Sequence, residues 1–241
     1  MKKSDLLYEG KAKKVFKTNE EGYLIVSYKD DATAFNGVKK GSIRNKGAIN
    51  NKMSNFLMKI LAKSDIETHY VEELNDRETV VKECEIIPLE VIVRNVAAGS
   101  LSKRLGLAEG VRLSMPVIEY CYKDDELGDP MVNRYHIQAM NIATIEELEL
   151  IEYLAFKIND NLQQVFNRID IELIDFKIEF GKLKNGNVIL ADEISPDTCR
   201  FWDKHTRMKL DKDRFRRDLG QVEEAYEEVY GRLLKYQEEL A

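Results

Sequence analysis

The chain has 241 residues, 44% of them hydrophobic and 33% charged, which is typical of a folded globular protein and excludes a disordered one. The 37 Lys and Arg against 43 Asp and Glu give a formal net charge of −6, which argues against a general affinity for nucleic acid. Three dispersed cysteines, and no apolar run near the roughly 18 residues that span a membrane, favour a reducing cytoplasm and no membrane partner.

The first third of the chain is predicted to be rich in strands. Leu7–Lys17 and Tyr23–Tyr28 have the composition of strands. Apolar residues then recur at helical spacing over Ile49–Leu61, which predicts an amphipathic helix. Strand-like segments follow around Thr68–Leu74 and Thr79–Cys84, so we expect a small sheet with one helix.

The first strand-like run carries lysines that could cover a nucleotide. Strand alternation places Lys11, Lys13 and Val15 on one face after Gly10, with lysines for phosphates and valine for a base. The pattern is weak alone, since no GxxxxGK[ST] motif is present. A lysine-rich edge strand facing solvent is the alternative interpretation.

A domain boundary is predicted where the chain leaves this sheet. We expect residues 1–84 to form an N-terminal nucleotide-covering lobe, and residues 85–241 to form a larger α+β lobe with metal and substrate sites. Just after the boundary, Leu89–Arg94 has the composition of a buried strand, with Glu90 and Arg94 on one face.

A short helix is predicted to begin at Leu101, after Gly99 and with Ser100 as its N-cap. A helix N-terminus beside Arg94 would suit a phosphate. An ordinary capped helix with an Arg94–Glu90 pair explains the same residues.

Two further helices are predicted in the second half of the chain. Thr144 and Glu147 form a capping box before an apolar stripe that runs from Leu148 to Val165. The last helix should extend from about Asp213 to the C-terminus, with an apolar seam at spacings of four and three residues. This seam favours a helix docked on the body of the protein, and a dimer contact is the alternative.

The segment Asp175–Asp197 is the most informative, because it predicts a hairpin with opposed acids. Asn185-Gly186 is typical of a two-residue turn, and the register of such a turn places Glu179 opposite Asp192. Opposed carboxylates repel unless a cation lies between them, and Mg²⁺ prefers oxygen ligands. Lys177 shares this face with Asp175 and Glu179. A solvent-facing strand with alternating charges is the alternative.

More charged residues follow the hairpin. Asp197 and Arg200 precede Trp202, the single tryptophan, and basic residues recur over Asp211–Asp218. Arg–aromatic neighbours can stack on single-stranded nucleic acid, but the interleaved acids argue against that partner.

Seven motifs occur in an order that identifies a family. The chain contains EGKAKKVF, DATAFNG, LEVIVRNVAAGSLSKRLG, DDELGDPMVN, LIDFKIEFG, ILADEISPDTCRFWD and LDKDRFRRDLG. Together they resemble the phosphoribosylaminoimidazole-succinocarboxamide synthase (SAICAR synthetase) family, from Leu7 to about Tyr230. The resemblance implies an α+β fold of two lobes, with an N-terminal antiparallel β lobe like those of kinases and ATP-grasp enzymes, and a larger α+β C-terminal lobe.

The resemblance also implies an activity. The family joins L-aspartate to the carboxylate of carboxyaminoimidazole ribonucleotide (CAIR), with ATP converted to ADP and phosphate, in purine biosynthesis. A carboxylate is a poor acyl donor, so phosphorylating it first makes an acyl phosphate that an amine can attack. Such transfer needs positioning and charge neutralisation more than a protein nucleophile.

Residue roles are carried over from the matching motifs. ATP-covering residues would be Lys11, Ala12, Lys13, Val15, Lys82 and Lys123. Glu179 and Asp192 would hold ATP-bound Mg²⁺, and Glu90 would face the CAIR carboxylate through a second metal. CAIR binding would use Glu90, Arg94, Ser100, Arg200 and Arg216. Lys177 would neutralise the transferring phosphoryl group and Asp197 would orient the substrate. Some family members have Asp where this chain has Asn36, and Asn cannot accept a proton as a general base would.

Two other functions remain open at this point. One is an ATP-dependent small-molecule kinase on the same lobe, and the other is a nucleotide-binding module without turnover. The partners expected are ATP, CAIR and L-aspartate, with no nucleic acid and no membrane. The apolar seam of the last helix and the habit of the family also favour a homodimer.

Overall fold

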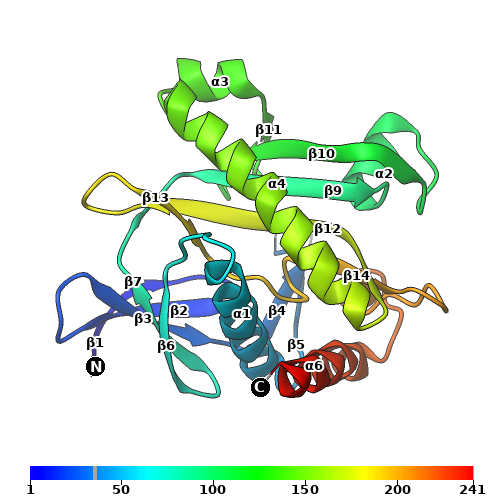
Figure 1. Ribbon diagram of the computed structural model, residues 1–241, viewed down its shortest axis with the longest axis horizontal. Helices are drawn as coiled ribbons and strands as arrows, with labels where there is room; N and C mark the ends of the chain where they lie inside the picture. The colour runs from blue at the N-terminus through cyan, green and yellow to red at the C-terminus, as the bar shows by residue number, and fades with distance from the viewer. Residues whose placement is uncertain (35–36, 241) are drawn as a thin grey trace.

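The computed structural model describes residues 1–34 and 37–240, which form an α+β fold with two main antiparallel sheets (Figure 1). The strands are β1 Lys3–Glu9, β2 Lys13–Thr18, β3 Tyr23–Tyr28, β4 Asp31–Ala34, β5 Lys39–Ser42, β6 Tyr70–Asn75, β7 Glu78–Lys82, β8 Glu85–Ile86, β9 Leu89–Val96, β10 Arg112–Tyr122, β11 Met131–Val132, β12 Ile171–Lys182, β13 Val188–Ala191 and β14 Cys199–Asp203. The helices are α1 Lys46–Ala62, α2 Gly99–Leu105, α3 Arg134–Ala139, α4 Ile145–Arg168, α5 Asp213–Arg216 and α6 Val222–Glu239.

The first sheet has the strand order β1-β2-β3-β7-β6 and includes the strand predicted at Tyr23–Tyr28. The single run predicted over Leu7–Lys17 is wrong, because the chain reverses within it. The Gly10 N–H donates to the Lys13 carbonyl over 2.8 Å, and this turn pairs β1 with β2. Lys11 therefore lies in a turn between two strands rather than on the face that carries Val15.

The second sheet has the order β11-β10-β9-β12-β13, and β14 and β8 also pair with β12. Alternation along β12 follows the prediction. Phe176, Ile178 and Phe180 are buried in the main core, where α4 crosses the sheet (Figure 1). Asp175 and Glu179 point to the other side and line a cavity.

The predicted register of the β12–β13 hairpin is wrong by one residue. Glu179 pairs with Ala191, not with Asp192. The reason is a longer loop: the Leu183 N–H donates to Asn187 over 2.9 Å, and the Gly186 N–H donates to Leu183 over 2.8 Å. Gly186 has φ +89°, so a three-residue loop that ends in a left-handed glycine replaces the two-residue turn.

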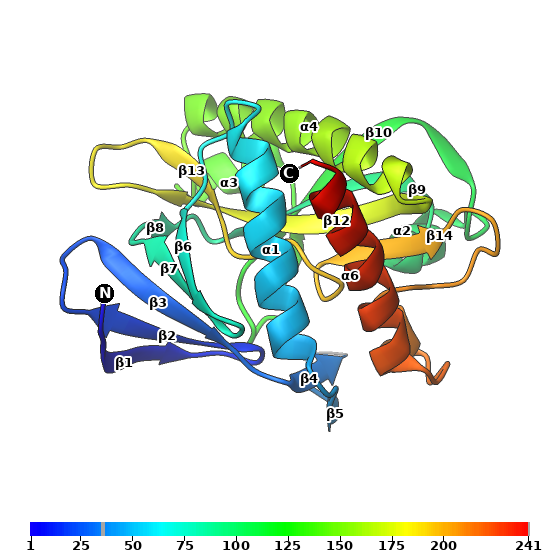
Figure 2. The same cartoon turned by 60° about the horizontal axis from the view of Figure 1, so that its bottom comes forward.

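One core joins three long helices to the second sheet. Buried faces of α1, α4 and α6 contribute to it, and α1 and α6 lie side by side (Figure 2). Thr144 and Glu147 form the predicted capping box at the start of α4. Among the residues described, no helix combines the length and the apolarity that crossing a membrane requires.

The last helix and the start of α2 differ from the prediction. The last helix is broken, because Gly220 adopts φ +70° and the Arg214 guanidinium binds the Leu219 and Gly220 carbonyls, which separates α5 from α6. The apolar seam of α6 is buried against the body, as the docked interpretation expected. Near the start of α2, the N-cap is Ala98 with no side-chain cap, and Ser100 lies inside the first turn.

Candidate functional site

A cavity of about 640 Å³ is lined by residues of both sheets. All fifteen residues predicted for the site line it: Lys11, Ala12, Lys13, Val15, Lys82, Glu90, Arg94, Ser100, Lys123, Lys177, Glu179, Asp192, Asp197, Arg200 and Arg216. Asn36 lies outside the described residues. The fold thus brings together side chains up to about 200 positions apart in the sequence, although their roles stay predictions.

Lys177 is the centre of an acidic cluster in this cavity. Its ammonium lies 2.7 Å from a Glu179 oxygen, 2.9 Å from Asp192 and 3.6 Å from Glu90. Although burial acts in the opposite direction, these carboxylates raise the pKa of Lys177 well above its usual value. Burial raises the pKa of Glu90 despite the nearby ammonium. Glu179 and Asp192 therefore meet through Lys177, not by direct cross-strand pairing.

Asp192 reaches this cluster because of its backbone. It follows β13 with φ +58°, a left-handed conformation that Asp adopts more readily than most residues. Its carboxylate also contacts Lys13 of β2, whose ammonium lies 3.1 Å from Glu193. Although burial opposes the effect, Lys13 and Lys177 hold the pKa of Asp192 well below its usual range. Lys13 thus links the first sheet to the end of β13.

The first sheet provides an apolar wall beside these charges. Val15 packs against the cluster formed by Val26, Tyr28 and Val81, and Val15, Val26 and Val81 line the cavity. Two lysines line the cavity with this wall: Lys13, whose ammonium lies 5.5 Å from the centroid of the Tyr28 ring, and Lys82, which pairs with Glu67 over 2.7 Å. An apolar wall with lysines at its edge suits a flat base that carries phosphates.

The outer lysines are paired with acids as well. Lys123 donates to Glu179 over 2.5 Å, and the exposed Lys11 donates to Asp125 over 2.6 Å. Lys11 thus joins the β1–β2 turn to the loop between β10 and β11.

A second group of charges lies farther along β12. Arg94 is buried and donates to Glu119 over 2.7 Å, to Asp175 over 2.8 Å and to the Ser100 hydroxyl over 3.0 Å. The Cα atoms of Asp175 and Glu179, four residues apart on one strand, lie roughly 13 Å apart, and Lys177 stands midway between them.

Arg200 continues this group toward α5. Its guanidinium contacts Asp175 and Asp213, each at 2.9 Å, and Arg216 donates to Asp213 over 2.7 Å. Despite burial, Arg200 and Arg216 lower the pKa of Asp213 to about 2. Gly99 permits the arrangement, since its φ is +54° and a Cβ there would lie 2.5 Å from an Arg200 nitrogen. Three arginines thus meet at one end of the cavity.

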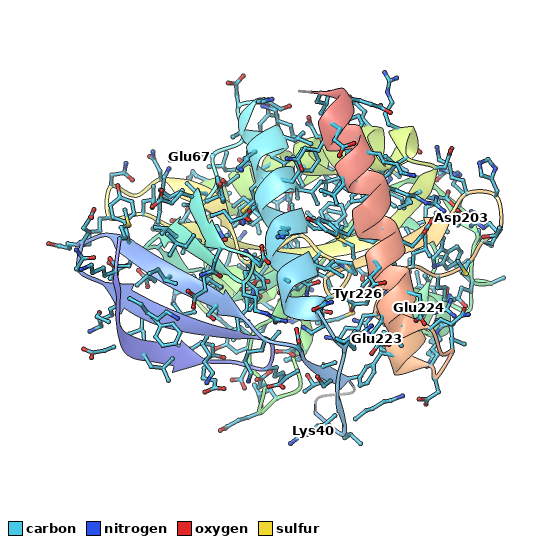
Figure 3. The ribbon with its side chains drawn as sticks, turned by 90° about the horizontal axis from the view of Figure 1, so that it is seen from below. Lys40, Glu67, Asp203, Glu223, Glu224 and Tyr226 are labelled. Carbon is cyan, nitrogen blue, oxygen red and sulfur yellow. The ribbon has the colours of Figure 1, made fainter. Side chains whose placement is uncertain are left out.

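Asp197 is held by residues that the sequence did not predict. Its carboxylate accepts from the Lys46 ammonium over 2.7 Å and from the Tyr226 hydroxyl over 2.6 Å, and Lys212 lies 3.5 Å away. Although burial opposes the effect, Lys212 and Lys46 lower the pKa of Asp197 well below its usual value. Figure 3 shows Tyr226 on the side of α6 that faces α1.

Some of the residues that bind Arg200 and Asp197 belong to patterns that are visible in the sequence. Asp213 and Lys212 belong to the charged run at Asp211–Asp218, in which the resemblance assigns a role to Arg216 alone. Lys46 stands at the start of a helix and Tyr226 within an apolar seam, where a solvated lysine and a packed ring are the ordinary interpretations. Only their convergence on Asp197 in space reveals them.

The carboxylates suit a hard cation. Glu179 and Asp192 each place an oxygen within 3 Å of the Lys177 ammonium, so the two oxygens are close neighbours that one cation could bridge. In residues 1–34 and 37–240, no group of three His, Cys, Asp or Glu side chains forms a metal cluster. Mg²⁺ commonly takes one or two protein carboxylates together with phosphate oxygens and waters, and this pair meets that requirement.

Comparisons with known proteins agree with one another. The family model for SAICAR synthetase matches residues 6–233. The phosphoribosylaminoimidazole-succinocarboxamide synthase of Caldanaerobacter subterraneus subsp. tengcongensis is 62% identical over 233 residues, covering 97% of this chain and 99% of that protein. The solved structure of the Ehrlichia chaffeensis synthase superposes with a TM-score of 0.94 at 49% identity, covering 95% of this chain and 98% of the other. A SAICAR synthetase in complex with ADP gives 0.91 at 49% identity, covering 94% and 96%.

Proposed function

Because the chain belongs to the SAICAR synthetase family, we propose that its cavity is where ATP, CAIR and L-aspartate meet. The protein is an ATP-using ligase of purine biosynthesis that forms SAICAR, as its motifs had indicated. The observation that carries the proposal is the cavity itself, in which the Lys177 cluster and the three arginines occupy the two ends of one β12 face.

The chemistry proceeds in two balanced steps. An oxygen of the CAIR carboxylate attacks the γ-phosphorus of ATP, so that a P–O bond forms and ADP leaves. The aspartate amine then attacks the acyl carbon of the resulting acyl phosphate, inorganic phosphate leaves, and the amine loses a proton as the amide forms. Neither step needs a protein nucleophile, and both gain from fixed positive charge near the moving phosphoryl group.

The nucleotide is assigned to the lobe formed by residues 1–84. Val15 and the neighbouring apolar wall contact the base, while Lys11, Ala12 and Lys13 cover the phosphates. Lys82 and Lys123 complete this assignment near the base and ribose. The apolar wall and the lysines beside it support the assignment.

Mg²⁺ would be held by Glu179 and Asp192, with Glu90 toward a second ion near the CAIR carboxylate. When bound, the cation supplies charge neutralisation at the phosphate oxygens. Lys177, which already neutralises these carboxylates, is positioned to stabilise the transferring phosphoryl group.

The CAIR phosphate is assigned to the arginine end of the cavity. Arg94, Ser100 and Arg200 share hydrogen bonds there, and Arg216 joins them through Asp213. Arg guanidinium groups suit a phosphate because their planar donors match its oxygens. Asp197 orients substrate from the loop between β13 and β14.

The cellular setting and the assembly belong to the same proposal. Purine biosynthesis from ATP and small acids suits the cytoplasm, and free cysteines suit a reducing compartment. The habit of the family favours a homodimer, although the α6 seam is already buried within one chain.

An omission assay tests the proposed function. ATP, Mg²⁺, CAIR and L-aspartate are supplied to the purified protein and left out one at a time, while ADP and amide product are measured. We expect SAICAR only when all four are present. A phosphorylated product that forms equally well without L-aspartate would instead identify a kinase.

A further inference from the structure

Glu119 is a buried acid of β10 that stands behind the cavity wall, next to a predicted binding residue. Its carboxylate accepts a hydrogen bond from Arg94 of β9 over 2.7 Å and another from Arg104 of α2. β9 and β10 are antiparallel neighbours, and Glu119 lies opposite Ile92, two residues along β9 from Arg94. Glu119 is therefore a diagonal neighbour of Arg94 on the same face of the sheet, at a separation that long side chains span.

The Arg94 guanidinium is held at each of its three nitrogens by a different element. Nε donates to Glu119, Nη1 donates to Asp175 of β12 over 2.8 Å, and Nη2 donates to the Ser100 hydroxyl of α2 over 3.0 Å. A guanidinium carries five N–H donors. Among the described residues these contacts use three of them, which leaves one N–H on Nη1 and one on Nη2. Because Glu119 occupies Nε, the remaining donors lie at the end of the guanidinium, where they suit two oxygens of one phosphate.

Glu119 also ties α2 to the sheet. This helix begins without a side-chain cap, and Arg104 in its last turn pairs with Glu119. Ser100 in its first turn accepts from Arg94. One carboxylate thus holds both the arginine and the helix that carries the hydroxyl partner of that arginine.

We propose that Glu119 positions Arg94 for the phosphate of CAIR. The inference rests on the proposed function and adds to it a positioning residue, which acts through Arg94 and does not touch the substrate. Without an acceptor at Nε, the guanidinium keeps Asp175 and Ser100 as partners but is free to turn between them. Its two remaining donors are then no longer held toward the phosphate, so the loss falls on CAIR and not on ATP.

A second acid of the same kind provides the matched control. Glu172 of β12 is as buried as Glu119, since each is 8% exposed. It likewise pairs with two arginines, Arg112 and Arg207, neither of which lines the cavity. A merely structural role of such an acid would therefore appear equally in both variants.

Glu119→Met keeps a straight side chain of similar length but removes the acceptor. It should raise the KM for CAIR at least about tenfold, the loss expected for a hydrogen bond to a charged group, and change the KM for ATP and L-aspartate less than about twofold. Glu172→Met should lower the melting temperature by a comparable amount and leave all three KM values unchanged. Glu119→Gln should restore most of the CAIR affinity, because its amide oxygen still accepts from Nε.

A double-mutant cycle shows whether Glu119 acts through Arg94. In an Arg94→Ala background, Glu119→Met should raise the KM for CAIR less than about twofold further, because the group that it positions is already absent. An equal effect in both backgrounds would overturn the inference, since Glu119 would then act without Arg94.

A binding measurement separates affinity from turnover. CAIR is titrated into enzyme loaded with ADP, where no phosphoryl transfer can occur, and Glu119→Met should weaken its binding by the same factor. Glu119→Leu takes its place if Glu119→Met melts below the assay temperature. An unchanged affinity for CAIR, or an equal loss in Glu172→Met, would overturn the inference. An unmodified protein that binds CAIR but forms no SAICAR would refute the proposed function alone, because the comparison of binding needs no turnover.

Discussion

Removing the Lys46 ammonium should expose how strongly the fold depends on one buried ion pair. The side chains of Lys46 and Asp197 are 1% and 5% exposed, and their charged atoms lie 2.7 Å apart. Lys46→Met keeps most of the side-chain volume but leaves the Asp197 carboxylate with the Tyr226 hydroxyl and the more distant Lys212. The variant therefore isolates the charge from the packing.

The magnitude follows from the residual partners. Breaking a buried pair from one side costs about 3–5 kcal/mol in the free energy of unfolding. Because Lys212 and Tyr226 still face the carboxylate, we expect the lower end, about 3 kcal/mol. For a chain of this size, about 2–4 °C of melting temperature is lost per kcal/mol, so Tm should fall by roughly 6–12 °C.

The pH dependence gives an independent check. The pKa of Asp197 is lowered in the folded protein, so its ionised form stabilises the fold above the unfolded pKa of about 4, and this stability is lost as pH falls through the folded value. Without Lys46 the folded pKa moves back toward the unfolded one. The stability gap between the unmodified protein and Lys46→Met should therefore narrow below about pH 4.

Urea denaturation of a double-mutant cycle measures the coupling. Asp197→Asn alone and Lys46→Met alone should each destabilise, whereas the double variant should lose clearly less than their sum, because it leaves no unpaired charge. Additivity within about 0.5 kcal/mol would refute the reasoning, since it would mean that the two groups do not stabilise each other.

Three further results are expected. Glu179→Gln should remove turnover by weakening Mg²⁺–ATP binding, and a purified variant with normal activity would contradict the metal assignment. Arg94→Ala should raise the CAIR requirement far more than the ATP requirement in steady-state assays, and equal increases would count against a phosphate role. Arg217 and Lys209 lower the pKa of Glu109 to about 2 despite burial, so its stabilising effect is present above pH 4.5 and is lost toward pH 2. Glu109→Gln should accordingly flatten that part of an acid titration of Tm, and an unchanged slope would argue against it.

Much of the fold was predictable because local rules agreed with the final packing. The Thr144 capping box, the apolar stripe of α4 and the β3 strand carry their own periodicity, and each formed as expected. The prediction failed where the length of a loop, by a single residue, sets the register of the paired strands. Asn185-Gly186 correctly indicated a hairpin, but local turn preference did not show whether two or three residues would form the loop, and the shift moved Asp192 off the strand.

The residues of the site also fall into those that the sequence could predict and those that it could not. Residues in dense charged motifs, such as Arg94 and Lys177, could be singled out from alternation and from resemblance to the family. Lys46 and Tyr226 could not be singled out, because their place in the site depends on contacts with Asp197 that span 151 and 29 positions of the chain. Nothing in a single sequence distinguishes a helical lysine that reaches solvent from one that is buried against an acid.

The way in which α6 completes the site has a consequence for how the protein is made. Lys46 is synthesised 226 − 46 = 180 residues before Tyr226, which at about 5–20 residues per second corresponds to roughly 9–36 s of translation. Asp197 is made 151 residues after Lys46, and the Tyr226 hydroxyl that binds the same carboxylate follows 29 residues later, so the set of groups that holds Asp197 is incomplete throughout that interval. Until α6 is made, the face of α1 that packs against α6 stays exposed in the nascent chain. A chaperone that recognises exposed apolar surface would bind that face. The loop that carries Asp197 is thus secured by the last helix only near the end of synthesis.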